Sequence, residues 1–211
     1  CYHKKRKYNT QMNNYKSDEE RYFADWLEEL KEADYVKSWE YEPETFVLAE
    51  KVDFPCLKRM KTKNKQEEFN GMQKVEYTYD FKILWDFKAV GIFIWDESIT
   101  YIKKSDVLFF NYGSTVISYI DIKGTFGGRN NSSAISAPIK MKWLYQKYGI
   151  YVQIIKPLGG LFKKTFYPES YFTTDKGNER SKRIKGKNIP ISELKEFKTI
   201  EQWKLQKNNC Q

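Results

Sequence analysis

The chain has 211 residues, and its 37 Lys and Arg against 28 Asp and Glu give a formal net charge of +9. Hydrophobic residues make up 40% and aromatic residues 17%, so one domain with a real core, with or without an appendage, is expected at this length. No apolar run reaches the roughly 18–20 residues that a membrane span needs, and no secretory signal opens the chain. We therefore expect a cytoplasmic protein without a membrane partner.

Histidine and cysteine usage excludes several enzyme classes. The single histidine, His3, lies in a basic amino-terminal segment, residues 1–16. A Ser-His-Asp triad, a Cys-His dyad and a His-rich zinc site each need an imidazole held in a packed site. The three cysteines are odd in number and form no CxxC motif, so neither a zinc cluster nor a disulfide framework is indicated. Hydrolytic chemistry in this chain would rest on carboxylates, lysines and a bound metal.

Charge is unevenly distributed along the chain. Residues 17–50 carry twelve acidic and three basic side chains, whereas residues 122–164 carry eight basic side chains and no acidic one. An acid-free basic stretch with interleaved aromatic residues is typical of a surface that binds phosphates. A solvated basic surface that binds nothing in particular is the alternative. A second basic run, residues 176–187, is expected to form an exposed arm.

The amino-terminal half is predicted to begin with a helix over about 17–32. Ser17 fits the N-cap and Glu20 the N3 position of a capping box, and apolar residues follow at helical spacing. Strands are expected next at 35–41 and 45–48. Residues 51–74 are polar and Lys-rich, and we interpret them as a loop.

Further strands and a second helix are expected in the rest of the chain. Alternation predicts a strand over 75–84, and β-branched content predicts a buried strand over 116–122. Between them, residues of about 85–112 resemble an inserted β-hairpin. After a Gly-rich loop, a helix is expected with Ser136 as N-cap, Pro138 near N1 and Gly149 at C′. The last elements are a strand at 150–155 and a final helix near 191–205.

These elements predict an α/β fold with the order α-β-β-β-α-β. Such an order suits a mixed central sheet flanked by helices. The chain then divides into the basic segment 1–16, a core over 17–156 and a basic carboxy-terminal extension over 157–211.

Four side chains are candidates for the chemistry. Asp121 and Lys123 lie two residues apart at the end of a buried strand, so period-2 geometry places them on one face. Burying such groups costs free energy unless they are paired or used. Asp80 ends the alternating segment, and two carboxylates converge if its strand neighbours 116–122. Glu20 can supply a third. Three carboxylates suit Mg²⁺, which activates water, while Lys123 can offset charge on the transition state.

This set of residues resembles the PD-(D/E)xK nuclease superfamily, in particular its small phage-encoded members. The matching motifs are Ser17-x-x-Glu20, Glu42-Pro43-Glu44-Thr45-Phe46-Val47-Leu48, Tyr77-x-x-Asp80-Phe81 and Asp121-Ile122-Lys123-Gly124. The resemblance implies a restriction-endonuclease-like core and a Mg²⁺-dependent DNA endonuclease, with Mn²⁺ able to substitute. Glu20, Asp80 and Asp121 would be metal ligands and Lys123 a catalytic residue. A junction-resolving enzyme acting in recombination, repair or genome processing in the host-cell cytoplasm is the favoured subtype.

Two choices among the carboxylates stay open. A Glu at N3 is normally a capping residue, and a helical wheel places Glu19 nearer the apolar stripe than Glu20. Asp80 and Asp121 are 41 residues apart, longer than is usual in the family, and Asp106 is the rival to Asp80. The flanking residues favour Asp80, with an insertion explaining the spacing.

Four basic residues are candidate contacts to the DNA backbone: Arg129, Lys140, Lys142 and Lys147. Contacts of this kind position DNA without reading its sequence. The expected substrate is duplex or branched DNA, and a homodimer is expected because two strands must be cut. The alternative function is a non-catalytic nucleic-acid-binding protein, which predicts no metal-dependent cleavage.

Overall fold

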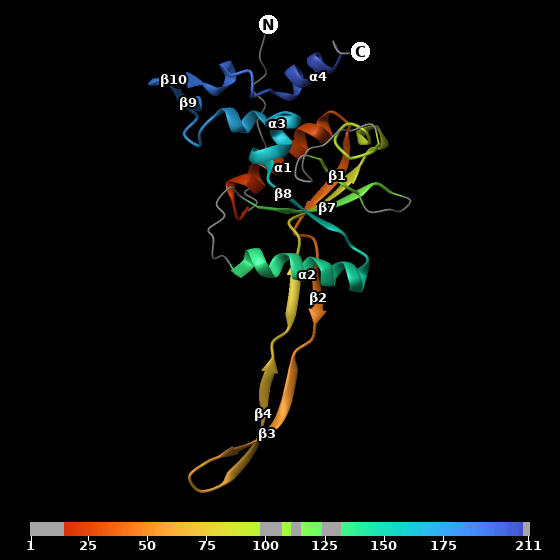
Figure 1. Ribbon diagram of the computed structural model, residues 1–211, viewed down its shortest axis with the longest axis vertical. Helices are drawn as coiled ribbons and strands as arrows, with labels where there is room; N and C mark the ends of the chain where they lie inside the picture. The colour runs from red at the N-terminus through yellow and green to blue at the C-terminus, as the bar shows by residue number, and fades with distance from the viewer. Residues whose placement is uncertain (1–14, 98–106, 111–114, 124–131, 209–211) are drawn as a thin grey trace.

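A computed structural model of the chain describes residues 15–97, 107–110, 115–123 and 132–208 (Figure 1). Its centre is a four-stranded sheet in the order β1-β6-β7-β8. The strands are β1 (Val36–Tyr41), β6 (Phe81–Trp85), β7 (Ile117–Ile122) and β8 (Val152–Ile155). β1, β6 and β7 run antiparallel to their neighbours, whereas β7 and β8 are parallel. The prediction of a mixed sheet is therefore confirmed.

Helices cover the two faces of this sheet. α1 (Asp18–Glu32) buries Phe23, Trp26, Leu27 and Leu30 in the larger core, together with Phe81 and Ile83 of β6. α2 (Ser132–Tyr148) contributes Leu144 to a smaller core with Tyr79 and Val152. α1 begins where the capping residues predict, because the Glu20 amide donates to the Ser17 hydroxyl at 3.2 Å. The helix-flanked α/β arrangement agrees with the sequence.

A long two-stranded arm projects from the body on the side of α2 (Figure 1). Its base pairs β2 (Thr45–Ala49) with β5 (Val75–Thr78), and its outer part pairs β3 (Val52–Arg59) with β4 (Asn64–Met72). The prediction of a loop over 51–74 is wrong. Both faces of the outer ribbon are exposed, so its strands lack the apolar alternation that marks a half-buried strand.

The segment 75–84, predicted as one strand, is two strands that belong to different sheets. β5 pairs with β2 in the arm, and β6 pairs with β1 and β7 in the body. The chain changes sheet at Tyr79 and Asp80. Asp80 keeps backbone bonds on both sides, since its amide donates to the Ile120 carbonyl at 3.0 Å and its carbonyl accepts from Glu42 at 2.8 Å.

The β-hairpin expected at about 85–112 is wrong for the part of this segment that the structure describes. Residues 85–97 hold the 3₁₀ helix η1 (Phe87–Ala89), and Ile94 makes isolated bridges to Val90 and Leu108. Asp86 caps η1 by accepting from the Lys88 amide at 3.1 Å. Phe93 and Ile94 then turn into the core under α1, so their apolar character reflects burial rather than strand pairing.

α2 starts earlier than predicted, at Ser132 rather than after Ser136, so Pro138 lies inside the helix. A proline there removes one backbone hydrogen bond and crowds the preceding turn, which is why the sequence favours a later start. The predicted end is correct: Gly149 adopts φ +70° and its amide donates to Tyr145.

The carboxy-terminal extension packs against the α1 side of the body through Phe166 and Trp203. Its elements are the π-helical turn η3 (Pro157–Leu161), α3 (Phe162–Lys164), η4 (Glu169–Phe172), β9 (Ser181–Ile184), β10 (Lys187–Pro190), η5 (Ile191–Glu193) and α4 (Ile200–Asn208). The final helix begins later than predicted because Thr199 and Gln202 exchange capping hydrogen bonds. The basic run 176–187 forms part of the β9–β10 hairpin. None of the described helices is long and apolar enough to cross a membrane.

Candidate active site

Asp80, directly before β6, lies opposite Asp121 of the neighbouring strand β7. Phe81 pairs with Ile120 in the antiparallel β6–β7 ladder, so the next position places Asp80 across from Asp121. The Asp80 carboxylate also accepts from the Ile122 amide at 2.6 Å. Both side chains are buried, with 9% and 2% of their surface exposed. The structure thus brings together two carboxylates that are 41 residues apart in the chain.

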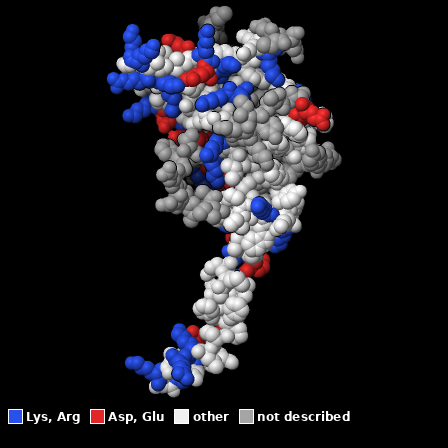
Figure 2. Space-filling model, in the orientation of Figure 1, with Lys and Arg blue, Asp and Glu red and all other residues white. Residues whose placement is uncertain are grey.

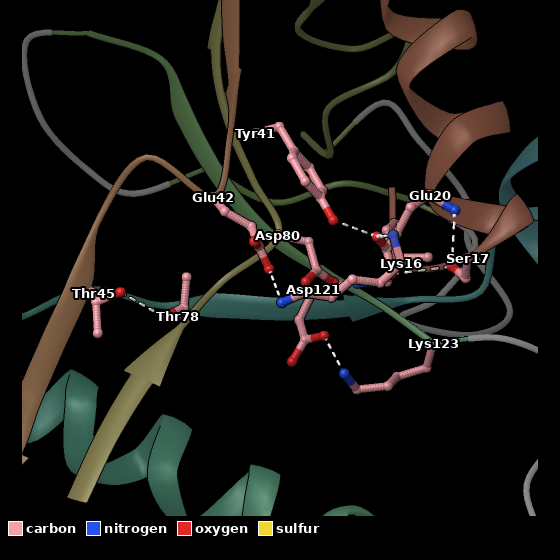
Figure 3. Close-up of polar contacts among 11 residues, drawn as sticks. Lys16, Ser17, Glu20, Tyr41, Glu42, Thr45, Thr78, Asp80, Asp121 and Lys123 are labelled. Atoms are coloured by element: carbon pink, nitrogen blue, oxygen red, sulfur yellow. Dashed lines mark hydrogen bonds and ion pairs between the residues drawn. The ribbon is translucent and has the colours of Figure 1, made fainter. Parts of the chain in front are cut away.

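Asp121 is held from two sides, and Figure 3 shows its contact with Lys123. One of its oxygens accepts from the Tyr77 hydroxyl at 2.8 Å, and the other accepts from the Lys123 amine. Asp121 and Lys123 share one face of β7, as period-2 geometry predicts. The Lys123 side chain is about half exposed, at 46%. Lys123 therefore links a buried carboxylate to solvent.

Even with the Lys123 amine beside Asp121, the ionised form of Asp80 is unfavourable. Burial, followed by the charge of Asp121, raises the pKa of Asp80 to about 8, although the Ile122 amide opposes the shift. The charge of Glu20 raises it further. At neutral pH the Asp80 carboxyl therefore retains its proton unless a further positive charge stabilises its ionised form.

Glu20, rather than Glu19, lines the same cavity as the carboxylate pair. Its carboxylate accepts from the Tyr41 hydroxyl at 2.6 Å and the Lys16 amide at 2.9 Å. Glu20 is buried, whereas Glu19 is only half-buried. The helical wheel misplaces these two residues because the first turn of α1 faces the cavity and β1 rather than the centre of the core. Glu20 serves as a capping residue and as part of the site wall.

The cavity has a volume of about 310 Å³ and opens to solvent, with room for about ten water molecules. Its wall combines the four predicted residues with side chains of both signs. The lining residues are Lys16, Glu20, Glu42, Tyr77, Thr78, Asp80, Asp121, Ile122, Lys123, Ser136, Ala137 and Lys140. Such a space accommodates a phosphate group with its hydration shell.

Two carboxylates, rather than the predicted three, are placed to hold a metal ion directly. Within the described ranges, no group of three or more His, Cys, Asp or Glu side chains is placed to hold a metal ion. Glu20 is engaged by Tyr41 and Lys16, which leaves Asp80 and Asp121 as the closest pair. Mg²⁺ is commonly held by one or two carboxylates, with waters and substrate phosphates completing its shell. The buried, like-charged pair beside an open cavity fits that mode.

No family model, curated protein or solved structure matches this chain.

The predicted DNA contacts on α2 divide into two kinds. Lys140 lines the cavity and donates to the Glu76 carbonyl at 3.0 Å, and Lys147 donates to the Val47 carbonyl at 2.8 Å. Both amines therefore tie α2 to the base of the arm. Lys142 is exposed. Arg129 and Asp106, the rival to Asp80, lie outside the described residues.

Sequence reasoning missed the two tyrosines that hold the carboxylates. Tyr77 lies three residues before Asp80. Its hydroxyl reaches Asp121 only because the chain passes from the arm to the central sheet between Tyr77 and Asp80, and the sequence does not show that change of sheet. Tyr41 pairs with Phe81 across β1 and β6, and this register places its hydroxyl near the first turn of α1. A prediction that β1 pairs with β6 would have indicated that Tyr41 lies near the site.

Proposed function

We propose that this protein is a metal-dependent DNA endonuclease that hydrolyses phosphodiester bonds in the cavity lined by Glu20, Asp80, Asp121 and Lys123. The observation that carries the proposal is the buried Asp80–Asp121 pair, with Lys123 beside it, at the wall of an open cavity. Two adjacent buried carboxylates destabilise a fold unless they are paired or used. Their use as cation ligands explains why the chain retains them.

Asp80 and Asp121 would hold the cation, with Glu20 contributing through water. A bound Mg²⁺ would supply a polarised phosphate and a water of lowered pKa. The chain's own residues then position the reaction. Tyr77 holds one oxygen of Asp121, so that carboxylate has a defined orientation. Lys123 reaches from Asp121 to the solvent-filled space, where its amine can contact a phosphate oxygen and offset developing charge.

The arrangement of elements also favours this proposal. α1, β1, β6, β7, α2 and β8 follow in the order α-β-β-β-α-β, with the arm inserted between β1 and β6. The candidate residues lie on α1, directly before β6, and at and just after the end of β7, an order that supports the proposal because it is similar to the one that the resemblance implies. A restriction-endonuclease-like core is therefore part of the proposal.

The substrate proposed is duplex or branched DNA. The chain carries a net charge of +9, which favours polyanionic partners. Lys142, exposed on α2, is proposed to contact the DNA backbone, and Arg129 remains a contact predicted from the sequence alone. A homodimer would allow both strands to be cut, and four-way junctions are the favoured substrate.

Cleavage of a panel of DNA substrates tests the activity. The wild-type protein is incubated with linear duplex, single-stranded and four-way-junction DNA in Mg²⁺, Mn²⁺ or EDTA. We expect cleavage that requires metal and is strongest on the junction. Lys123→Ala should abolish cleavage while leaving DNA binding within about threefold, since positioning contacts to phosphates lie elsewhere. Binding without cleavage on every substrate would contradict the proposal and favour a non-catalytic nucleic-acid-binding protein.

A further inference from the structure

The β3–β4 arm ends in a tight, strongly basic tip. The Met60 amide donates to the Lys63 carbonyl at 2.9 Å and closes the turn. Residues 58–65 hold five basic side chains and no acidic one, and Figure 2 shows Lys and Arg gathered at this end of the arm. The basic tip comprises Lys58, Arg59, Lys61, Lys63 and Lys65.

Most of this charge is unneutralised. Lys58 and Lys65 both pair with Glu67, at 3.1 Å and 3.3 Å. Arg59, Lys61 and Lys63 form no salt bridge with any residue that the structure describes. Three cations without an ion pair to any described residue thus lie at the end of a narrow ribbon (Figure 2).

The arm also exposes apolar side chains that the body does not cover. At least half of the surface of each is accessible, and the residues are Phe54, Leu57, Met60, Phe69 and Met72. A two-stranded ribbon is at best marginally stable alone in water, so a surface of this kind indicates a partner. A second copy of this chain would bring an identical basic tip and the same positive net charge, which disfavours pairing between two arms. A polyanion is complementary to the tip.

We propose that the β3–β4 arm binds duplex DNA and anchors the substrate at a distance from the cleavage cavity. This inference deepens the proposed nuclease function and rests on it for the identity of the substrate. A two-stranded ribbon has dimensions that the major groove of B-DNA admits. The basic tip supplies phosphate contacts, and the exposed apolar side chains supply contacts to base and sugar edges.

The base of the arm places this contact relative to the cavity. Thr78 of β5 lines the cavity and its hydroxyl bonds that of Thr45 at 2.7 Å. From Thr45 to Arg59 the ribbon rises about 3.3 Å per residue, which places the tip roughly 45 Å away. That length corresponds to about 13 base pairs of B-DNA at 3.4 Å each. The arm therefore requires a duplex that continues well past the cavity.

A salt titration of DNA binding tests this inference without using cleavage. Binding of a fluorescent 30-base-pair duplex is measured by anisotropy in EDTA for the wild type and for Arg59→Gln/Lys61→Gln/Lys63→Gln. Losing three phosphate contacts should reduce the slope of log K against log salt by about 2.7. Between 50 and 200 mM salt, wild-type affinity should then fall about 40-fold further than that of the variant.

A matched control separates the arm from net charge. Arg183→Gln/Lys185→Gln/Lys187→Gln removes three exposed cations from the β9–β10 hairpin and should change the slope by less than about 1, because those residues are not assigned a phosphate contact. Equal effects in the two triple variants would overturn the inference, since general electrostatics would then account for binding.

A second measurement varies the length of the duplex. The wild type should bind the 30-base-pair duplex at least tenfold more tightly than a 10-base-pair duplex, and the tip variant should lose that preference. Wild-type behaviour of the tip variant, or a change only in its oligomeric mass on sedimentation, would overturn the inference in favour of a protein partner. If the wild type binds duplex through the tip but never cleaves it, the arm assignment stands and the nuclease proposal fails.

Discussion

The buried carboxyl groups of Asp80 and Asp121 destabilise the folded protein when both are ionised. Each is buried and each is within the field of the other, and among the described residues a lysine contacts Asp121 but not Asp80. When the pKa of a carboxyl group is higher in the folded state than in the unfolded chain, ionising that group destabilises the folded state. In the absence of a cation, the pair should therefore make the stability of the protein depend on pH.

Replacing Asp80 by Asn should stabilise the metal-free protein more at pH 8 than at pH 5. The pKa of Asp80 is about 8 in the folded protein and about 3.9 in the unfolded chain. Between these values the native state binds more protons, so stability falls as pH rises. We expect a gain of a few kcal/mol at pH 8, at about 1.4 kcal/mol per unit. Urea unfolding in EDTA measures it.

Glu193→Gln, at an exposed carboxylate, is the control for this measurement and should show little change at either pH. A gain for Asp80→Asn that is the same at pH 5 and pH 8 would contradict the assignment of the shift to Asp80.

Tyr77 and Tyr79 offer a matched pair of hydroxyl deletions. The Tyr77 hydroxyl donates to Asp121, whereas the Tyr79 hydroxyl is buried without a partner among the described residues. Tyr77→Phe should cost about 1–3 kcal/mol, because it removes a donor from a buried carboxylate. Tyr79→Phe should be neutral or stabilising. Urea denaturation compares them, and equal effects would show that the Tyr77 bond does not orient Asp121.

At the scale of elements, the sequence is most informative where local signals act. The α1 cap, the buried strands β7 and β8 and the end of α2 at Gly149 follow from capping, β-branched content and a left-handed glycine. The arm was missed because both faces of β3 and β4 are exposed. The break at Asp80 was missed because apolar alternation continues through a change of sheet. Phe93 and Ile94 gave a strand-like pattern because they are buried in a turn.

The arm should be dispensable for folding. Ala49 pairs with Val75 at the end of its base, so replacing residues 50–74 by Asn-Gly joins these residues by a two-residue hairpin turn. None of the deleted residues belongs to either core. We expect the melting temperature to change by less than about 4 °C, corresponding to under 1 kcal/mol, as calorimetry would measure. A fall of 10 °C or more would show that the arm stabilises the body.

At the scale of the whole molecule, the cavity lies where α1, the base of the arm, the central sheet and α2 meet. The acidic segment 17–50 supplies Glu20 and Glu42, and the basic remainder supplies Lys123 and Lys140. The sequence predicted Glu20, Asp80, Asp121 and Lys123 as a set through motifs and a strand end. It did not predict that Glu20 is held by Tyr41, because that contact depends on the β1–β6 register.

The most direct test of the central claim is the single-turnover cleavage rate of Asp121→Asn beside the wild type, in Mg²⁺, on the substrate that the wild type cleaves best. Asp121→Asn should lose the bound cation, which stabilises the transition state by several kcal/mol. At 1.36 kcal/mol per tenfold change in rate, the cleavage rate should be at least about a thousandfold lower than that of the wild type. DNA binding should stay within about threefold, since phosphate contacts lie elsewhere. Cleavage by Asp121→Asn at the wild-type rate would contradict the account.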